Sequence, residues 1–117
     1  MEKSNIEKLN EYFDYTISLC SSDLLDKDDN VILYNVYEEF DSCSWSYLHV
    51  DTLNLLLDVG VIDQTIFDLS LSLRELSIRL FNSDLDRTVE ELKRNSEWQK
   101  VFDLCDAIIK LKRELRT

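Results

Sequence analysis

The sequence predicts an all-α protein, a single compact helical domain (residues 1–117) with five to six helices. The chain contains no proline and one glycine, Gly60. Tight hairpin turns depend on these two residue types, so a fold built of β-hairpins is disfavoured. The 44% of hydrophobic residues, with two Trp, five Tyr and five Phe, is too high for intrinsic disorder even at a net charge of -11. A chain of this length can bury roughly two thirds of its unfolded surface around a core.

The first helix is predicted over residues 5–20, where apolar side chains recur every three or four positions. Ser4 and Glu7 have the spacing of a capping box, in which each side chain accepts a hydrogen bond from the other residue's backbone amide. The predicted buried stripe consists of Ile6, Leu9, Phe13, Ile17 and Cys20. One apolar face on an otherwise polar helix indicates packing against a core.

A short polar link over residues 21–28 is expected before the second helix. Asp28 or Asp29 has a side-chain oxygen that can cap the first turn of this helix. The predicted buried face carries Ile32, Val36 and Phe40, with Leu33 and Tyr37 beside it. The helix is expected to end near Ser42, and an uncharged link follows it.

The third helix is predicted over residues 47–59 and ends at the single glycine. Gly60 can adopt the positive φ that often follows a helix C-terminus. Asp63 then has the position of an N-cap for a fourth helix with two apolar stripes about 120° apart. One stripe consists of Ile66, Leu69, Leu73, Leu76 and Leu80, and the other of Phe67, Leu71 and Ile78. A helix that is apolar on two faces is expected at the centre of the bundle.

A short helix over residues 87–94 and a long C-terminal helix complete the predicted fold. Ser96 and Gln99 have the spacing of a capping box for the last helix. Its inward side chains are predicted to be Trp98, Val101, Phe102, Cys105, Ile108 and Ile109. On the fourth helix, Glu75 and Arg79 are spaced and ordered as an i, i+4 ion pair.

Negative charge is concentrated in the first half of the chain. Residues 1–68 contain 15 acidic and 3 basic side chains, whereas residues 69–117 contain 9 acidic and 10 basic ones. Such a field repels nucleic acid and anionic membranes and attracts a basic partner. Solubility is the alternative explanation, but solubility does not require charge to be segregated along the chain.

No group of residues has the pattern of a metal, cofactor or catalytic site. The acidic run from Asp26 resembles the start of an EF-hand calcium loop. That loop needs glycine where this chain has Val31, and a bidentate glutamate where it has Tyr37. His49 is the only histidine, too few for a metal or hydrolytic site without partners. We therefore expect no enzyme activity, no metal, no cofactor and no small-molecule substrate.

One group of aromatic and acidic side chains is predicted to bind a partner protein. With α-helical rotation of 100° per residue, Tyr34, Glu38 and Asp41 fall in one sector opposite the buried face. Trp45 and Tyr47 follow in the uncharged link, and aromatic anchors among carboxylates suit a binding hot spot. The predicted partner-binding residues are Asp26, Asp28, Asp29, Tyr34, Glu38, Asp41, Trp45 and Tyr47. Packing of Trp45 against the core is an equally good interpretation.

The pattern of residues 48–110 resembles that of a known protein family. They contain the run Leu55-Leu56-Leu57-Asp58-Val59-Gly60-Val61-Ile62-Asp63, which leads into a leucine-striped helix. In this pattern, its length and its acidity, the chain resembles the immunity proteins of bacterial contact-dependent growth inhibition and related polymorphic toxin systems. The resemblance implies a cytoplasmic helical protein that binds and blocks one cognate toxin, commonly a nuclease.

Charge and resemblance together predict an inhibitor of a basic toxin domain, an RNase or tRNase. A nuclease has a basic groove because it must hold phosphates. Carboxylates between Asp26 and Asp41 would occupy the phosphate subsites and occlude that groove. Two alternatives stay open: an acidic nucleic-acid mimic that binds a host DNA-binding protein, and a regulatory adaptor.

A cytoplasmic location is also expected from the chain itself. The first residues lack a basic segment followed by an apolar stretch, and the longest charge-free run, residues 42–50, is too short to span a membrane. Cys20, Cys43 and Cys105 are odd in number and far apart, as is typical of reduced thiols.

Overall fold

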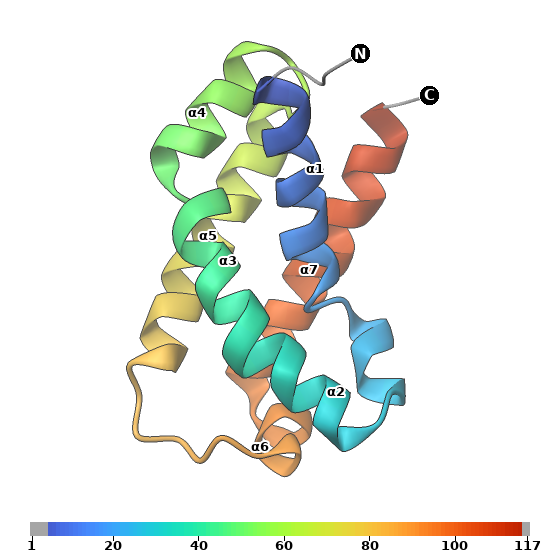
Figure 1. Ribbon diagram of the computed structural model, residues 1–117, viewed down its shortest axis with the longest axis vertical. Helices are drawn as coiled ribbons and strands as arrows, with labels where there is room; N and C mark the ends of the chain where they lie inside the picture. The colour runs from blue at the N-terminus through green and yellow to red at the C-terminus, as the bar shows by residue number, and fades with distance from the viewer. Residues whose placement is uncertain (1–4, 116–117) are drawn as a thin grey trace.

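Helices make up most of residues 5–115, the part of the chain that the computed structural model describes (Figure 1). No β-strand occurs in this range. The elements in chain order are α1 (Asn5–Ser18), the 3-10 helix η1 (Ser22–Asp26), α2 (Asp29–Leu33), the π-helix η2 (Tyr34–Phe40), α3 (Asp41–Tyr47), α4 (Val50–Asp58), α5 (Gln64–Phe81), α6 (Val89–Arg94) and α7 (Ser96–Leu115). Since α2, η2 and α3 form one continuous helix, the described range holds six helices besides η1. The predicted all-α fold is confirmed.

α1 ends at Ser18, two residues before the predicted end. Phe13, Ile17 and Cys20 are buried as the stripe predicts, because their spacing places them on the side that faces the other helices. Ser4, the first residue of the predicted capping box, lies outside the described residues. η1 occupies much of the predicted polar link and buries Leu24, so this segment contributes to the core.

The second helix is longer than predicted. Helical backbone runs without a break through residues 29–47, so Trp45 lies on α3 and the predicted uncharged link is wrong. Phe40 and Leu48 are fully buried and hold this segment against the core. Ser44 also donates its hydroxyl hydrogen to the backbone carbonyl of Asp41 (3.1 Å), which satisfies the serine within the helix.

Side-chain caps define where α4 and α5 begin. His49 precedes α4, and its Nδ1 accepts a hydrogen bond from the backbone amide of Asp51 (3.1 Å). The single histidine therefore has a structural role. Asp63 caps α5 as predicted, since its Oδ1 accepts from the backbone amide of Ile66 (2.9 Å).

Gly60 terminates α4 with a positive φ of 82°, as predicted. Its amide donates to the carbonyl of Leu57 (3.0 Å), and the amide of Val61 donates to the carbonyl of Leu56 (3.1 Å). These two bonds form a Schellman motif, which satisfies the last carbonyls of the helix. Glycine is favoured here because L side chains rarely adopt this backbone conformation.

α5 packs against α3, α4 and α7, and both predicted stripes face neighbours. Of the first stripe, Ile66, Leu73, Leu76 and Leu80 are buried; of the second, Phe67, Leu71 and Ile78 are half-buried. Arg79 pairs with Glu97 of α7, with Nη2 and Oε1 3.1 Å apart, and not with Glu75 as its spacing predicts. Because α7 packs against α5, Arg79 meets a carboxylate from another helix, and the spacing of residues within α5 cannot predict that pair.

Asn95, not Ser96, caps α7. Its Oδ1 accepts hydrogen bonds from the backbone amides of Glu97 (2.8 Å) and Trp98 (3.2 Å). Gln99 donates its side-chain amide to two backbone carbonyls at the end of α6, so the predicted capping box is wrong. Asparagine and serine rank alike as N-caps, so propensity does not decide between them. The helix begins at Ser96, which makes Asn95 the flanking residue whose side chain reaches the first free amides.

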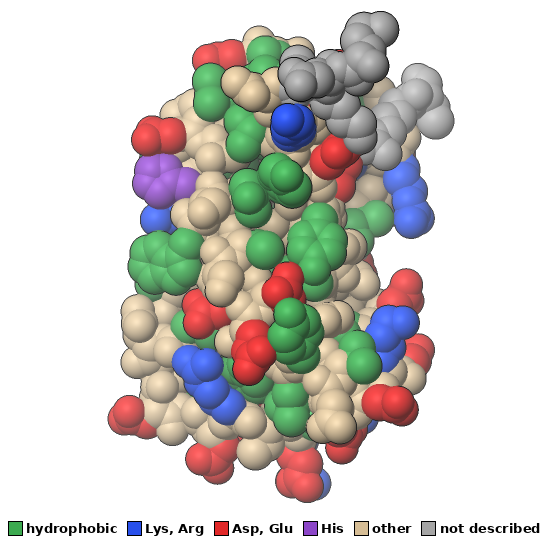
Figure 2. Space-filling model, in the orientation of Figure 1, with side chains coloured by type: hydrophobic (Ala, Val, Ile, Leu, Met, Phe, Trp, Pro, Cys, Tyr) green, Lys and Arg blue, Asp and Glu red, His purple; other side chains and the backbone are tan. Residues whose placement is uncertain are grey.

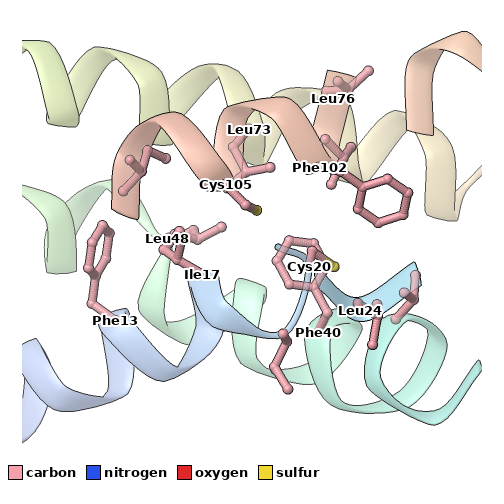
Figure 3. Close-up of a cluster of buried hydrophobic side chains, with 14 of the residues drawn as sticks. Phe13, Ile17, Cys20, Leu24, Phe40, Leu48, Leu73, Leu76, Phe102 and Cys105 are labelled. Atoms are coloured by element: carbon pink, nitrogen blue, oxygen red, sulfur yellow. The ribbon is translucent and has the colours of Figure 1, made fainter. Parts of the chain in front are cut away.

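The core lies where α7 packs between α5 and α1 (Figure 3). Phe102 and Cys105 of α7 face Leu73 of α5 on one side and Ile17 and Cys20 on the other. All five side chains are at most 1% exposed, so this contact contributes to the hydrophobic stabilisation of the fold. Within residues 5–115, no helix has the length and apolarity that crossing a membrane requires.

Candidate protein-binding surface

α1 and the continuous helix α2–η2–α3 form one face of the molecule. They lie nearer the viewer in Figure 1, with α5 and α7 behind them. Hydrophobic side chains gather over the middle of this face, with carboxylates among them (Figure 2). Tyr12, Tyr15 and Tyr34 are each between 45% and 51% exposed. Exposed aromatic side chains of this kind are the typical anchors of protein–protein contacts.

A groove of about 460 Å³ runs along this face. We call it the tyrosine groove, and it is lined by Glu11, Tyr12, Tyr15, Cys43 and Tyr47. The rings of Tyr12 and Tyr47 join α1 to α3, with centroids 5.0 Å apart and planes inclined by 33°. Among the described residues, the lining therefore presents aromatic rings together with one carboxylate and no basic side chain.

Glu39 joins two tyrosines from different helices beside this groove. Its Oε2 accepts a hydrogen bond from the hydroxyl of Tyr15, and its Oε1 accepts one from the hydroxyl of Tyr34, each 2.9 Å long. We call these three residues the Tyr-Glu-Tyr bridge. Tyr15 also lines the groove, and Cys43 follows Glu39 by one helical turn, so the carboxylate lies at the edge of the groove.

The π-helix η2 decides which carboxylate meets Tyr34. Hydrogen bonds in a π-helix connect residues five apart, so Tyr34 and Glu39 lie one turn from each other. In an α-helix the same two residues would be separated by roughly 140° around the axis. The α-helical rotation assumed for Tyr34, Glu38 and Asp41 does not hold here, and Glu39 becomes the partner of Tyr34.

The predicted partner-binding residues are divided among three places, and the first is the tyrosine groove. Tyr47 lines the groove, and Tyr34 belongs to the bridge beside it. Glu38 is exposed, and its charge contributes to raising the pKa of Tyr34, so it lies close by. These three residues therefore share one surface.

The second place is a hollow of about 220 Å³ between α3 and α5. Asp41 and Trp45 line it together with Arg87, whose guanidinium also lies 5.3 Å from the ring centroid of Tyr37. Trp45 is 57% exposed, so it does not cap the core, and that interpretation is wrong. Its position on α3 points this large aromatic side chain toward solvent.

The third place is the turn from η1 into α2. Asp26, Asp28 and Asp29 are exposed there, at the end of the bundle where α2 and α6 meet (Figure 1). Asp28 precedes α2, but its side chain forms no capping hydrogen bond. These carboxylates extend the acidic surface without joining the tyrosine groove.

Five residues of the groove and the bridge were missed by sequence reasoning: Glu11, Tyr12, Tyr15, Glu39 and Cys43. Part of the signal was present, because Tyr12 and Tyr15 fall between the members of the α1 stripe and must face outward. The pairing of Tyr15 with Glu39 has no signal in the sequence, since these residues are 24 positions apart. Only the packing of α1 against the long helix brings them together.

The environment of the bridge raises the pKa of its tyrosines. Hydrogen bonding to Glu39 is the main cause for both Tyr15 and Tyr34, which keeps their hydroxyl groups protonated as donors. Burial raises the pKa of the Cys43 thiol, and the charge of Glu39 adds to this effect. Cys43 is therefore a poor nucleophile at neutral pH.

The side chains of this surface are of the kinds that can bind a cationic group. It presents aromatic faces, hydroxyl groups and carboxylates. Among residues 5–115, no three histidine, cysteine or carboxylate side chains are arranged to hold a metal ion. No protein-family model, curated protein sequence or solved structure matches the chain.

Proposed function

We propose that this chain is an immunity protein, which binds a basic toxin domain of the RNase or tRNase class and blocks its nuclease activity. It acts in the cytoplasm of the cell that must survive the toxin. The observation that carries the proposal is the set of exposed tyrosines around Glu39 on the face of α1 and α2–η2–α3. Aromatic anchors next to carboxylates suit a partner whose surface is basic.

Affinity and association rate come from different parts of this surface. The tyrosine rings and Trp45 can bury apolar area against a partner, which supplies most of the binding free energy. The net charge of -11 acts at longer range and can raise the association rate with a basic partner roughly 10- to 1000-fold at low salt. A rapid inhibitor is useful because an active nuclease does damage before it is bound.

Occlusion is the proposed mode of inhibition. A nuclease binds phosphates through lysine and arginine side chains, and these residues also attract carboxylates. The carboxylates of Asp26, Asp28, Asp29 and Glu38 would occupy the phosphate subsites while the tyrosines contact the rim of the groove. Substrate RNA is then excluded by charge and by volume.

The test needs a candidate toxin domain, which is sought as the C-terminal end of a large secreted protein in the reading frame directly upstream. The toxin domain is produced in bacterial cells with and without this chain, and the purified proteins are mixed in increasing ratio with an RNA substrate. We expect cells to survive only when this chain is present, and cleavage to stop at equimolar ratio. Growth arrest in both cultures, or a complex that retains full nuclease activity, would overturn the proposal.

A further inference from the structure

The tyrosine groove and Glu39 together have the chemistry of a site for one side chain. The groove volume of about 460 Å³ falls within the range of about 300–1000 Å³ that is typical of ligand sites. Its lining is mostly aromatic, and the ring pair of Tyr12 and Tyr47 is already in contact across the two helices. No large rearrangement is needed to present these rings to a ligand.

Glu39 keeps capacity for further hydrogen bonds. A carboxylate has about four lone-pair positions, and the two tyrosine hydroxyls use one on each oxygen. The same two bonds hold the carboxylate in place, so a partner that binds it loses little additional side-chain freedom. Both oxygens can therefore accept from a planar donor that offers two parallel N–H groups.

We propose that this site receives an arginine side chain of the basic partner, with the guanidinium paired to Glu39 and stacked against the tyrosine rings of the groove. The inference rests on the proposed function for the identity of the partner, but not for the chemistry of the site. Arginine fits better than lysine, because only a guanidinium offers a planar pair of donors and a flat face for stacking. The acidic surroundings, which include Glu11 in the groove itself, favour a cation over an anionic or neutral occupant.

The experiment titrates the full chain with hexa-arginine and, separately, with hexa-lysine at equal ionic strength. Binding is followed by NMR through the ring signals of Tyr12 and Tyr47 and the backbone amide of Glu39. We expect hexa-arginine to shift these signals and to bind several-fold more tightly than hexa-lysine. Glu39→Gln should weaken hexa-arginine binding roughly tenfold, because a charge-assisted pair is replaced by a neutral one.

Glu75→Gln is the matched control, since Glu75 is an exposed carboxylate of α5 in a different groove and the change in net charge is the same. We expect it to weaken binding less than twofold. Tyr12→Leu keeps apolar volume but removes one ring, and it should weaken binding several-fold. Thermal melts of each variant establish that the fold is intact.

Two results would overturn the inference: equal affinity for the two peptides, or equal losses from Glu39→Gln and Glu75→Gln. Either would mean that the surface attracts cations only through its overall charge. The proposed function would be unaffected by that result if the chain still stops the toxin. Conversely, a chain that binds hexa-arginine in the groove but leaves the nuclease active would keep the inference and lose the proposed function.

Discussion

Lys112 donates a hydrogen bond to Asp14, with Nζ and Oδ1 2.6 Å apart, and thereby joins α7 to α1. The side chain of Lys112 is only 6% exposed, and that of Asp14 is 36% exposed. Asn10 accepts a second hydrogen bond from the same ammonium, which also lies 5.1 Å from the ring centroid of Phe13. A buried ammonium is tolerated only with such partners, so the contact fixes how the two helices meet.

Asp14→Asn should destabilise the protein because it removes a carboxylate that pairs with the buried ammonium of Lys112. We expect the free energy of unfolding to fall by about 2 kcal/mol, below the ~3–5 kcal/mol of a fully buried pair because Asp14 is partly exposed. The double variant Asp14→Asn with Lys112→Met removes the charge as well and should recover part of this loss. Urea unfolding of both variants measures the difference. A double variant less stable than Asp14→Asn would show that the ammonium does not need the carboxylate.

The bridge predicts an alkaline pH dependence. The raised pKa values of Tyr15 and Tyr34 mean that the folded state holds these phenolic protons more tightly than the unfolded chain does. Their contribution to stability is therefore complete below pH 10, the ordinary pKa of tyrosine, and is lost as the pH rises through the folded pKa. Burial raises the pKa of Tyr37 to about 12, so Tyr37 should ionise later than an exposed tyrosine or together with unfolding.

Tyrosinate absorbance measures this ionisation directly. In Glu39→Ala, the transitions of Tyr15 and Tyr34 should move to lower pH, because their acceptor and its charge are removed. The transition of Tyr37 should stay at about pH 12 and serves as the internal control. Unchanged titration of Tyr15 and Tyr34 in the variant would mean that the bridge does not persist in solution.

The three thiols should differ in reactivity. Cys20 and Cys105 are fully buried, and burial raises the pKa of each well above 9.0, whereas Cys43 is half-buried in the tyrosine groove. Modification requires the thiolate and access to it. A thiol-reactive reagent at mildly alkaline pH should therefore modify one cysteine slowly in the native protein and all three in denaturant. Rapid modification of two or more native thiols would contradict the placement of α1 against α7.

Replacing leucines of the α5 stripe by alanine should destabilise the protein more at a buried position than at the edge of the core. Leu73 is fully buried between α5 and α7, so Leu73→Ala should cost about 3–5 kcal/mol by leaving a cavity. Leu76 lies at the edge, where it lines a groove between the same helices, and Leu76→Ala should cost about 2 kcal/mol. Chemical unfolding gives both values. Leu73→Ala should also fail to protect cells from the toxin, and equal stability of the two variants would show that α5 is not central.

Binding of the toxin domain should depend on the carboxylates of the α2–η2–α3 helix and not on the net charge alone. Glu38→Gln with Asp41→Asn should slow association with the toxin domain and reduce the salt dependence of its rate. Glu75→Gln with Asp103→Asn removes the same charge from the groove between α5 and α7 and should change neither. Asp106 is unsuitable as a control, because its carboxylate accepts a hydrogen bond from the backbone amide of Ser22 (3.0 Å). Equal effects of the two pairs in stopped-flow measurements would exclude this face as the docking surface.

The helical class, the buried stripes and several helix ends could all be predicted from the order of residues along the chain. The clearest cases are Gly60 and Asp63, whose capping roles depend only on neighbours within about one turn. In the first predicted stripe, Phe13, Ile17 and Cys20 are buried as their spacing predicts, and Ile6 and Leu9 are half-buried. Side-chain periodicity and capping are local properties, and local properties can be read along the chain.

Contacts between distant segments could not be predicted in this way. The π-helix η2, the cap at Asn95, and the pairing of Lys112 with Asp14 are found only in the folded structure. The candidate site changed for the same reason: Glu39 meets Tyr15 because α1 packs against the long helix, and it meets Tyr34 because the backbone between them is π-helical. These contacts depend on how helices distant in sequence fit together, and that fit is set by the packing of the whole core.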